Sequence, residues 1–297
     1  MFSELKHQFL LHFIILLWGL TGILGKLIEL DAVFIVWYRV LFSFITLGVG
    51  MFFFRAPFFV NSKKELSKIF LVGSFVALHW VFFYKSIQLS TASFGILCLS
   101  TTTLHVSWLE PLVIGKKISL TEVLIGLVVV FGVFFVSGEL ENQNLSALFY
   151  GLSSALFAAF FAVFNLKLSE KNTPAQISFY EMGAATLFIT IILIFQGRFS
   201  FSTLSLSVSD FFWLLFLSII CTSFAFLAMI FVMKKLGAFT VSLSINLEPV
   251  YTILLAIFIL KENTVLGSRF YFGAVFIVAV VVANSLIKNL KKKNVKP

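Results

Sequence analysis

The chain has 297 residues, of which 60% are hydrophobic and only 12% charged, and its formal net charge is +9. This composition excludes an ordinary water-soluble domain, in which about a quarter of the residues are charged. The basic residues lie in short segments between apolar stretches, not in a patch interleaved with aromatic residues, so the charge does not indicate nucleic-acid binding. We therefore expect a polytopic membrane protein whose surroundings are the lipid bilayer.

Ten apolar segments follow one another along the chain, and about 20 apolar residues in a helix are enough to cross a bilayer. The predicted fold class is therefore all-α integral membrane, with ten transmembrane helices. The segments cover approximately residues 9–28, 32–54, 67–87, 91–113, 120–137, 147–167, 176–196, 210–233, 238–260 and 267–287.

The distribution of lysine and arginine predicts the orientation of these helices, because short cytoplasmic loops carry an excess of both residues. With a cytoplasmic N-terminus, sixteen of the 22 Lys and Arg residues fall on the cytoplasmic side, five fall on the other side, and Arg39 lies within a helix. This division predicts that both termini are cytoplasmic. The Lys-rich segment 288–297 is then a basic cytoplasmic tail, and attraction to anionic lipid together with topology explains its charge.

The two halves of the chain show weak but ordered self-similarity. A shift of 147 residues places Gly126 on Gly273, for example. We predict a first five-helix repeat over 1–140 and a second over 145–290. An odd number of helices in each repeat requires opposite orientations in the membrane, and inverted repeats around a central cavity are typical of secondary transporters.

A series of short motifs extends along nearly the whole chain. The motifs are Trp18-Gly19 with Lys26, Arg39, Leu89-Ser90-Thr91-Ala92, Leu236-Gly237-Ala238, Pro249 followed by Lys261-Glu262, and Gly126 with Gly273. In this order they resemble the drug/metabolite transporter superfamily in its EamA-type, ten-helix form. The resemblance implies two inverted five-helix repeats around a central cavity, alternating access, and most often export of amino acids or other small metabolites. It also implies a bacterial inner (plasma) membrane, and it leaves open a monomer or a homodimer.

Glu248 is the strongest candidate for a functional residue because it lies in the middle of the ninth segment. A carboxylate at that depth is costly and needs a partner or water. Pro249 lacks an N–H group, so we expect the helix to kink or open beside Glu248 and to border a cavity. Continuous helical spacing would place Ser244 and Tyr251 on the face of Glu248, with Asn246 on another face. Glu248 is either a proton-coupling group or a structural carboxylate.

Arg39 lies about two turns into the second segment, where an arginine must find a carboxylate, carbonyl groups or water. Its guanidinium group can bind a carboxylate with two parallel hydrogen bonds. Arg39 is therefore either a clamp for a substrate carboxylate or part of a structural ion pair with a helix such as the ninth.

The other ionisable and aromatic residues within the segments are candidates for gating, proton relay or cavity lining. Glu110 and Glu181, with the helix break at Pro249, are the candidate gating residues, and both carboxylates could instead pair with loop lysines. His79 and His105 could relay protons because histidine titrates near neutrality, although a lone histidine in a helix is more often a packing residue. Aromatic residues could line the cavity or merely pack between helices; these are Trp18, Trp80, Tyr84 and Tyr251.

We compare three hypotheses for the function. The first is a secondary active transporter of small metabolites, with amino acids foremost and with proton coupling through Glu248. The second is a membrane-embedded enzyme that acts on lipid-linked substrates, but the chain's two Asp residues both lie at segment ends and no metalloprotease or nucleophile-elbow motif occurs. The third is a membrane regulator without transport. We expect no cofactor, no metal and no enzymatic activity.

Overall fold

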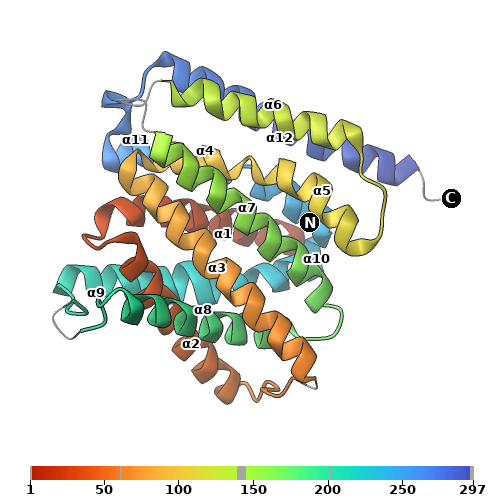
Figure 1. Ribbon diagram of the computed structural model, residues 1–297. Helices are drawn as coiled ribbons and strands as arrows, with labels where there is room; N and C mark the ends of the chain where they lie inside the picture. Colours follow the sequence, from red (N-terminus) through yellow and green to blue (C-terminus); the bar gives the residue numbers. More distant parts are fainter. Residues whose placement is uncertain (1, 61, 139–144, 201–202, 295–297) are drawn as a thin grey trace.

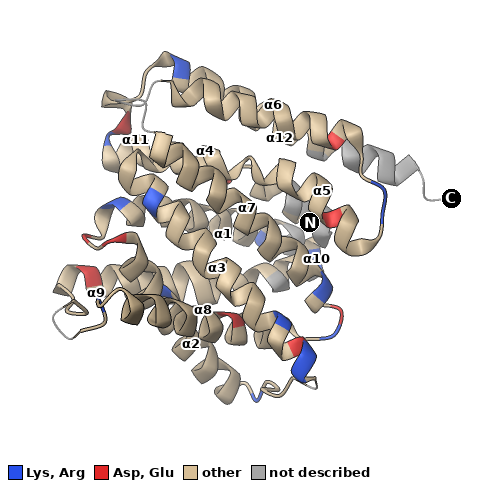
Figure 2. Ribbon diagram, viewed as in Figure 1, with Lys and Arg blue, Asp and Glu red and all other residues tan. Residues whose placement is uncertain are grey.

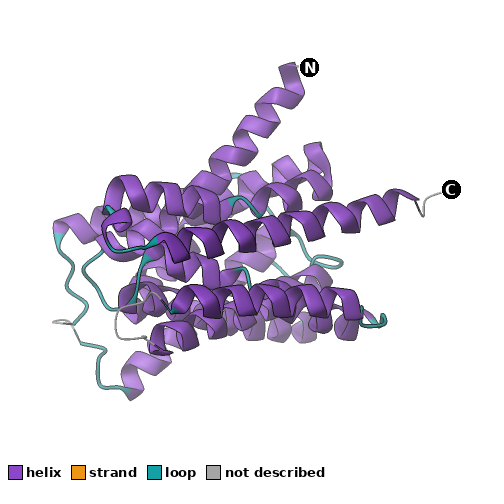
Figure 3. Cartoon of the chain, turned by 90° about the horizontal axis from the view of Figure 1, so that it is seen from above, coloured by secondary structure: helices purple, strands orange, loops and turns teal. Residues whose placement is uncertain are grey.

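The computed structural model describes residues 2–60, 62–138, 145–200 and 203–294, and in this part of the chain all regular structure is helical (Figures 1 and 3). The helices are α1 (Phe2–Leu27), α2 (Ala32–Phe53), α3 (Lys63–Leu89), α4 (Ala92–Leu99), α5 (Thr102–Ile114), α6 (Leu120–Ser137), α7 (Leu145–Leu168), α8 (Pro174–Phe195), α9 (Val208–Leu215), the π-helix η2 (Phe216–Phe224), α10 (Ala225–Ile245), α11 (Glu248–Leu260), the 3₁₀-helix η3 (Glu262–Thr264) and α12 (Ser268–Asn294).

Most helices run between two ends of the bundle, and the beginning of α1 and the end of α12 lie toward the same end (Figure 1). Charged residues gather at the two ends, whereas the middle of the bundle is almost free of them (Figure 2). We call one end the basic end; the other, formed by residues 28–31, 90–91, 196–200, 203–207 and 261–267, is called the opposite end. The basic end carries Arg55, Lys63, Lys64, Lys68, Lys116, Lys117, Lys167 and Lys171.

Among the described residues, eight helical segments are long and apolar enough to cross a membrane, and two shorter apolar helices, Glu248–Leu260 and Ser268–Asn284, accompany them. One of the eight, Ala92–Ile114, combines α4 and α5. The protein is therefore a multi-pass, all-α membrane protein. The prediction of ten helices is matched in part, since two of the ten segments appear as shorter helices.

The boundary between the eighth and ninth predicted segments differs from the sequence prediction. Residues 234–237 were expected to form a loop, but α10 continues through them from Ala225 to Ile245. The reason is that this stretch contains no proline, and its one glycine lowers helix stability by only about 1 kcal/mol relative to alanine. The interruption lies instead after Ile245, next to Glu248.

Side chains at the loop junctions explain why several helices begin where they do. The Asp31 carboxylate accepts from the N–H of Val33 at the start of α2, and Thr91 accepts from the N–H of Phe94 at the start of α4. Thr173 and Gln176 form a capping box at the start of α8. Such contacts satisfy N–H groups that have no partner within the first turn of a helix.

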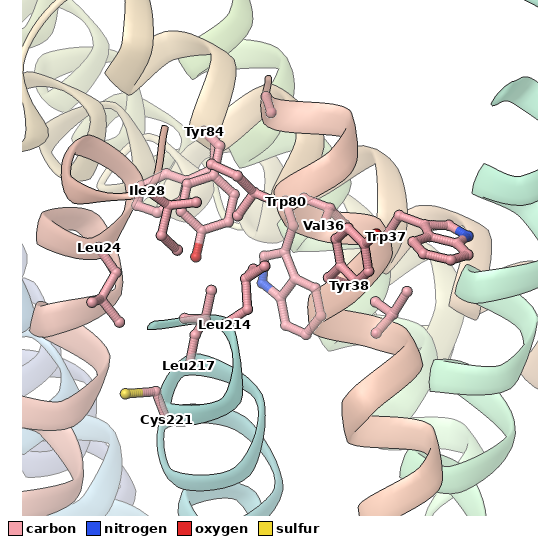
Figure 4. Packing of buried hydrophobic residues seen from close by; sticks show 14 of the residues in the cluster. Leu24, Ile28, Val36, Trp37, Tyr38, Trp80, Tyr84, Leu214, Leu217 and Cys221 are labelled. Atoms are coloured by element: carbon pink, nitrogen blue, oxygen red, sulfur yellow. The ribbon is translucent and has the colours of Figure 1, made fainter. Parts of the chain in front are cut away.

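The largest buried cluster joins α1, α2, α3, α4, α8, α9 and η2 with α11 (Figure 4). Tyr84 is fully buried in it, and Trp80, Leu217 and Cys221 lie around it. Close helix contacts hold this region: a Cβ atom at Gly25 would lie 2.6 Å from the Tyr84 ring. Membrane helices associate through such close packing of small residues, because lipid supplies no hydrophobic drive between them.

An apolar hollow of about 740 Å³ lies on the α6/α12 pair, away from the main cluster, and is lined by side chains such as Phe131, Phe135 and Phe272. All three of these phenylalanine side chains are exposed. In a membrane protein such an apolar surface faces lipid.

Candidate functional site

The helical path is interrupted immediately before Glu248. α10 ends at Ile245, Asn246 and Leu247 form a turn, and α11 begins at Glu248 with Pro249 in its first turn. A proline is tolerated at this position because an N–H group there would have no partner within the helix. The predicted break beside Glu248 is confirmed.

A second interruption lies between α4 and α5. α4 ends at Leu99 and α5 begins at Thr102, and the Thr101 hydroxyl donates to the Cys98 carbonyl at 2.7 Å. α4 packs against α11, which brings this break close to the one at Glu248. Irregular backbone at membrane depth is tolerated where it is buried in protein or borders a water-filled cavity.

A cavity of about 670 Å³ lies between the two breaks and is lined by α4, α5, α7, α10, α11 and α12. Small-molecule pockets span roughly 300–1,000 Å³. The lining includes Leu166 near the end of α7 and Asn284 far along α12, so the cavity extends from the middle of the bundle toward the basic end. Its neutral polar groups belong to Ser100, Thr102, Thr103, Asn246 and Asn284.

Glu248 supplies the charge of this cavity. It is the one ionisable side chain among the described residues of the lining, and Asn246 and Pro249 line the cavity beside it. In the described part of the chain, its carboxylate forms neither a hydrogen bond nor an ion pair. A carboxylate in a low-dielectric interior needs a cation, a proton or water, so Glu248 is suited to pair with a cation or to carry a proton in this cavity.

Arg39 lies in a second cluster, buried to 3% exposure. Its Nε donates to the Thr222 hydroxyl at 3.0 Å and its Nη1 to the Tyr84 hydroxyl at 2.9 Å. The guanidinium carbon also lies 3.7 Å from the centre of the Trp80 ring, a cation–π contact. These partners come from α3 and η2, and Trp80 and Tyr84 belong to the core shown in Figure 4.

The π-helix η2 positions the Thr222 hydroxyl for this contact. Thr222 Oγ1 donates to the carbonyl of Leu217, five residues earlier, at 2.9 Å, and accepts from Arg39. Single π-helical turns within α-helices often occur at functional sites. Arg39 is not among the described residues that line the cavity.

Several predicted residues lie outside the cavity lining. The Tyr251 hydroxyl lies 3.0 Å from His12 Nδ1 on α1. Of the predicted stripe, Glu248 and Tyr251 keep their spacing of three residues on α11, whereas Ser244 lies on α10, beyond the helix break. Trp18 packs between α1 and α10, 6.1 Å from the Phe226 ring.

The two histidines also lie outside the lining of the cavity. His79 Nδ1 lies 2.9 Å from the Ser154 hydroxyl and 3.0 Å from the Ser154 carbonyl oxygen, and these contacts join α3 to α7. This arrangement is that of a hydrogen-bonded packing residue. His105 is half-buried on α5.

The two other candidate carboxylates occupy different environments. Glu181 on α8 is 1% exposed, and the Asn165 side chain on α7 is hydrogen-bonded to it. Glu181 Oε1 and Asn165 Oδ1 have no partner in the described part of the chain. Glu110 is half-buried on α5, four residues beyond the lining residue Val106, which places it on the lining face of α5 one turn nearer the basic end.

Sequence reasoning missed several residues that the structure brings to the site. Thr222 and Asn165 contact Arg39 and Glu181, and Asn284 reaches the cavity from α12. A usable signal existed for Asn284, because it is an isolated amide in an otherwise apolar stretch. The polar run Ser100–Thr103 was another signal, since it stands in the first half where Glu248 stands in the second.

The opposite end is joined by polar contacts between segments far apart in sequence. Glu262 accepts from the N–H groups of Ala92 at 2.7 Å and Ser93 at 3.1 Å, at the start of α4. Lys26 donates to the Ser90 carbonyl at 2.6 Å. Further contacts there are Lys85–Asp31 at 3.3 Å, Arg198–Asp31 at 3.8 Å and Glu29 N–H to Asp210 at 3.0 Å.

The described residues contain no group of three or more His, Cys, Asp or Glu side chains placed to hold a metal ion. The described lining of the cavity offers one carboxylate, hydroxyl and amide groups, and apolar side chains. Such a lining can bind and orient a small molecule.

The helices and the cavity together define a class: a multi-pass membrane protein with a polar, small-molecule-sized cavity between interrupted helices. The family model described as the EamA-like transporter family matches residues 6–138 and, a second time, residues 145–286. The chain belongs to the EamA-like transporter family, of the drug/metabolite transporter superfamily.

Comparison with known proteins adds the following. A search of curated proteins found no match. A solved structure described only as "Crystal structure of protein" aligns with a TM-score of 0.64 at 12% identity, over 95% of this chain and 98% of its own. At this identity the likeness shows a shared fold and no more.

Proposed function

We propose that the protein is a secondary active transporter that exports amino acids or related small metabolites by alternating access, with Glu248 as the proton-coupling group. The observation that carries this proposal is the cavity at the two helix breaks, which the Glu248 carboxylate lines without a hydrogen bond or ion pair to any described residue. Discontinuous helices that meet near the membrane midplane are the usual setting of transporter sites. Membership in a transporter family favours this function over an enzyme or a regulator.

We further propose that residues 1–140 and 145–290 form two inverted five-helix repeats. The supporting observation is that equivalent interruptions recur 146 residues apart: α4 and α10 end at Leu99 and Ile245, and α5 and α11 begin at Thr102 and Glu248. In this arrangement α4 and α5 form one span, and the last part of α10 with α11 forms its counterpart. Ten spans result, although two of them are short.

The orientation follows from charge. The basic end faces the cytoplasm, both termini lie there, and the membrane is a bacterial inner membrane. The cavity extends toward the basic end, while the contacts of Glu262, Lys26 and Asp31 join the opposite end. The described conformation then corresponds to the inward-open side of the cycle, and those contacts must separate when the cavity opens outward. The protein acts as a monomer or as a homodimer.

Gating falls to residues at the cavity mouth and near the break. Glu110 continues the lining face of α5 toward the basic end, and Pro249 borders the turn between α10 and α11. Glu181 contributes through its contact with Asn165, which lies between α7 and α8. A change in the packing of α3, α7 and α8 would therefore alter the contact between Glu181 and Asn165.

Transport in proteoliposomes tests the proposal. Separate proteoliposomes contain wild type, Glu248→Gln or the matched control Glu170→Gln, and they are loaded with a mixed panel of labelled amino acids and nucleosides. Glu170 is an exposed residue after α7. Flux is followed with and without a pH gradient. We expect gradient-driven flux of some compound in wild type and in Glu170→Gln, and loss of its gradient-driven part in Glu248→Gln. Absence of flux for the whole panel in folded protein would refute the transporter of amino acids.

A further inference from the structure

We infer that the cavity binds its substrate through a positively charged amino group, with the Glu248 carboxylate as counter-ion, and that it selects organic ammonium compounds over carboxylate anions. This inference rests on the proposed function and specifies the substrate class. It departs from the hypothesis of a substrate carboxylate held by Arg39.

The charged group in the described lining of the cavity is a carboxylate. Among the described residues that border the cavity, Glu248 is ionisable and the remaining polar groups are the neutral hydroxyls and amides of Ser100, Thr102, Thr103, Asn246 and Asn284. The face of α5 that lines the cavity continues to a second carboxylate, Glu110, one turn nearer the basic end. The path into the cavity therefore runs from one negative side chain to another.

Arg39 is held by contacts with other helices. Two of its nitrogens donate to Thr222 and Tyr84, and its flat face lies against Trp80 at 3.7 Å. A substrate carboxylate in the cavity does not meet the guanidinium group, because Arg39 is not among the described residues of the lining and its contacts are with α3 and η2. The structure thus uses Arg39 to hold α2, α3 and η2 together.

Two other sources of positive charge near the cavity are the side chain of Lys167 and the N-terminus of α11. Lys167 follows the lining residue Leu166, but its Nζ lies 3.4 Å from the Val113 carbonyl oxygen, at the end of α5. The N-terminus of α11 also favours an anion, yet Glu248 is its first residue and already supplies that negative charge. The described lining offers no vacant cationic position to a carboxylate.

An ammonium group matches this lining. The group carries three N–H donors, which suit one carboxylate and nearby hydroxyl or amide oxygens. Pairing with Glu248 neutralises two charges that would each be costly in the interior of the membrane. The aliphatic lining, including Ile96, Leu99 and Val278, can hold the hydrocarbon part of the compound.

A set of three probes that share one hydrocarbon part tests the inference. Phenethylamine carries only the ammonium group, 3-phenylpropanoate only the carboxylate, and phenylalanine both. Binding to the full-length protein in detergent is measured by calorimetry for wild type, Glu248→Gln, Glu248→Asp and the control Glu170→Gln. Circular dichroism confirms that each variant is folded.

We expect wild type to bind phenethylamine and not 3-phenylpropanoate. Loss of a charge-assisted contact of about 1.5–3 kcal/mol corresponds to roughly a ten- to hundredfold weaker affinity in Glu248→Gln. Glu248→Asp and Glu170→Gln should retain most of the affinity because both keep the charge in the cavity. Equal binding of amine and acid by wild type, no amine binding, or an unaffected Glu248→Gln would each overturn the inference.

The two proposals fail in different ways. Proteoliposomes that carry 3-phenylpropanoate but not phenethylamine would refute the ammonium site and leave the transporter standing. Binding of phenethylamine in detergent, without flux of any compound in proteoliposomes, would leave the ammonium site standing and refute transport.

Discussion

Glu262 joins the two halves of the chain at the opposite end, and its replacement should destabilise the fold. It is 5% exposed, and its carboxylate accepts from two N–H groups at the start of α4, at 2.7 and 3.1 Å. Glu262→Ala leaves both N–H groups buried and unpaired, at a cost of about 1–3 kcal/mol each. The free energy of unfolding should therefore fall by about 2–6 kcal/mol.

Glu262→Gln separates the charge from the hydrogen bonds. The amide retains one carbonyl acceptor but loses the attraction of a carboxylate to the N-terminus of α4, so we expect a smaller loss of about 1–2 kcal/mol. Unfolding in mixed micelles with increasing SDS, followed by circular dichroism, measures both losses. Asn263→Ala, at an exposed neighbouring position, is the control. If Glu262→Ala lies within about 0.5 kcal/mol of that control, the reasoning is refuted.

Two further predictions use the same unfolding measurement. Arg39→Lys keeps the charge but cannot reproduce the paired contacts with Thr222 and Tyr84, so we expect a loss of about 1–3 kcal/mol, and wild-type stability would contradict the structural role of the guanidinium group. Gly73→Ala places a Cβ atom 2.7 Å from a backbone oxygen of α8 and should destabilise by about 1–3 kcal/mol. Gly50→Ala, with nothing within 4 Å, should instead stabilise by about 0.5–1 kcal/mol, so equal effects at the two glycines would be inconsistent with the close α3–α8 contact.

Much of the fold could be predicted from the sequence because membrane helices leave strong local signals. The apolar segments follow from length and hydropathy, and the break beside Glu248 follows from Pro249, whose missing N–H is a property of the residue itself. The length of α10 was harder to predict from the sequence. Whether residues 234–237 form a loop or a helix is a small local difference that the surrounding packing decides.

The site was predictable only where one residue carries the information. Glu248, Asn246 and Pro249 were identified because polar residues and a proline stand out in an apolar segment, and the structure places all three at the cavity. The partners of Arg39 could not be predicted, because Thr222 lies 183 residues away along the chain and reaches Arg39 through a π-helix with no recognised sequence signal. Which role these residues play stays a prediction for the transport and binding experiments.

The interruption between α4 and α5 also bears on how the chain enters the membrane. α4 has eight residues, which span only about 12 Å of a roughly 30 Å hydrocarbon core, so neither half can cross alone. The combined segment Ala92–Ile114 has a mean hydropathy of 1.2, the lowest among the eight candidate spans in the described part of the chain. The hydroxyl groups that make a polar cavity thus weaken the signal by which the insertion machinery recognises a span. Stable insertion of this segment should depend on its neighbours α3 and α7, which makes their arrival a checkpoint in biogenesis.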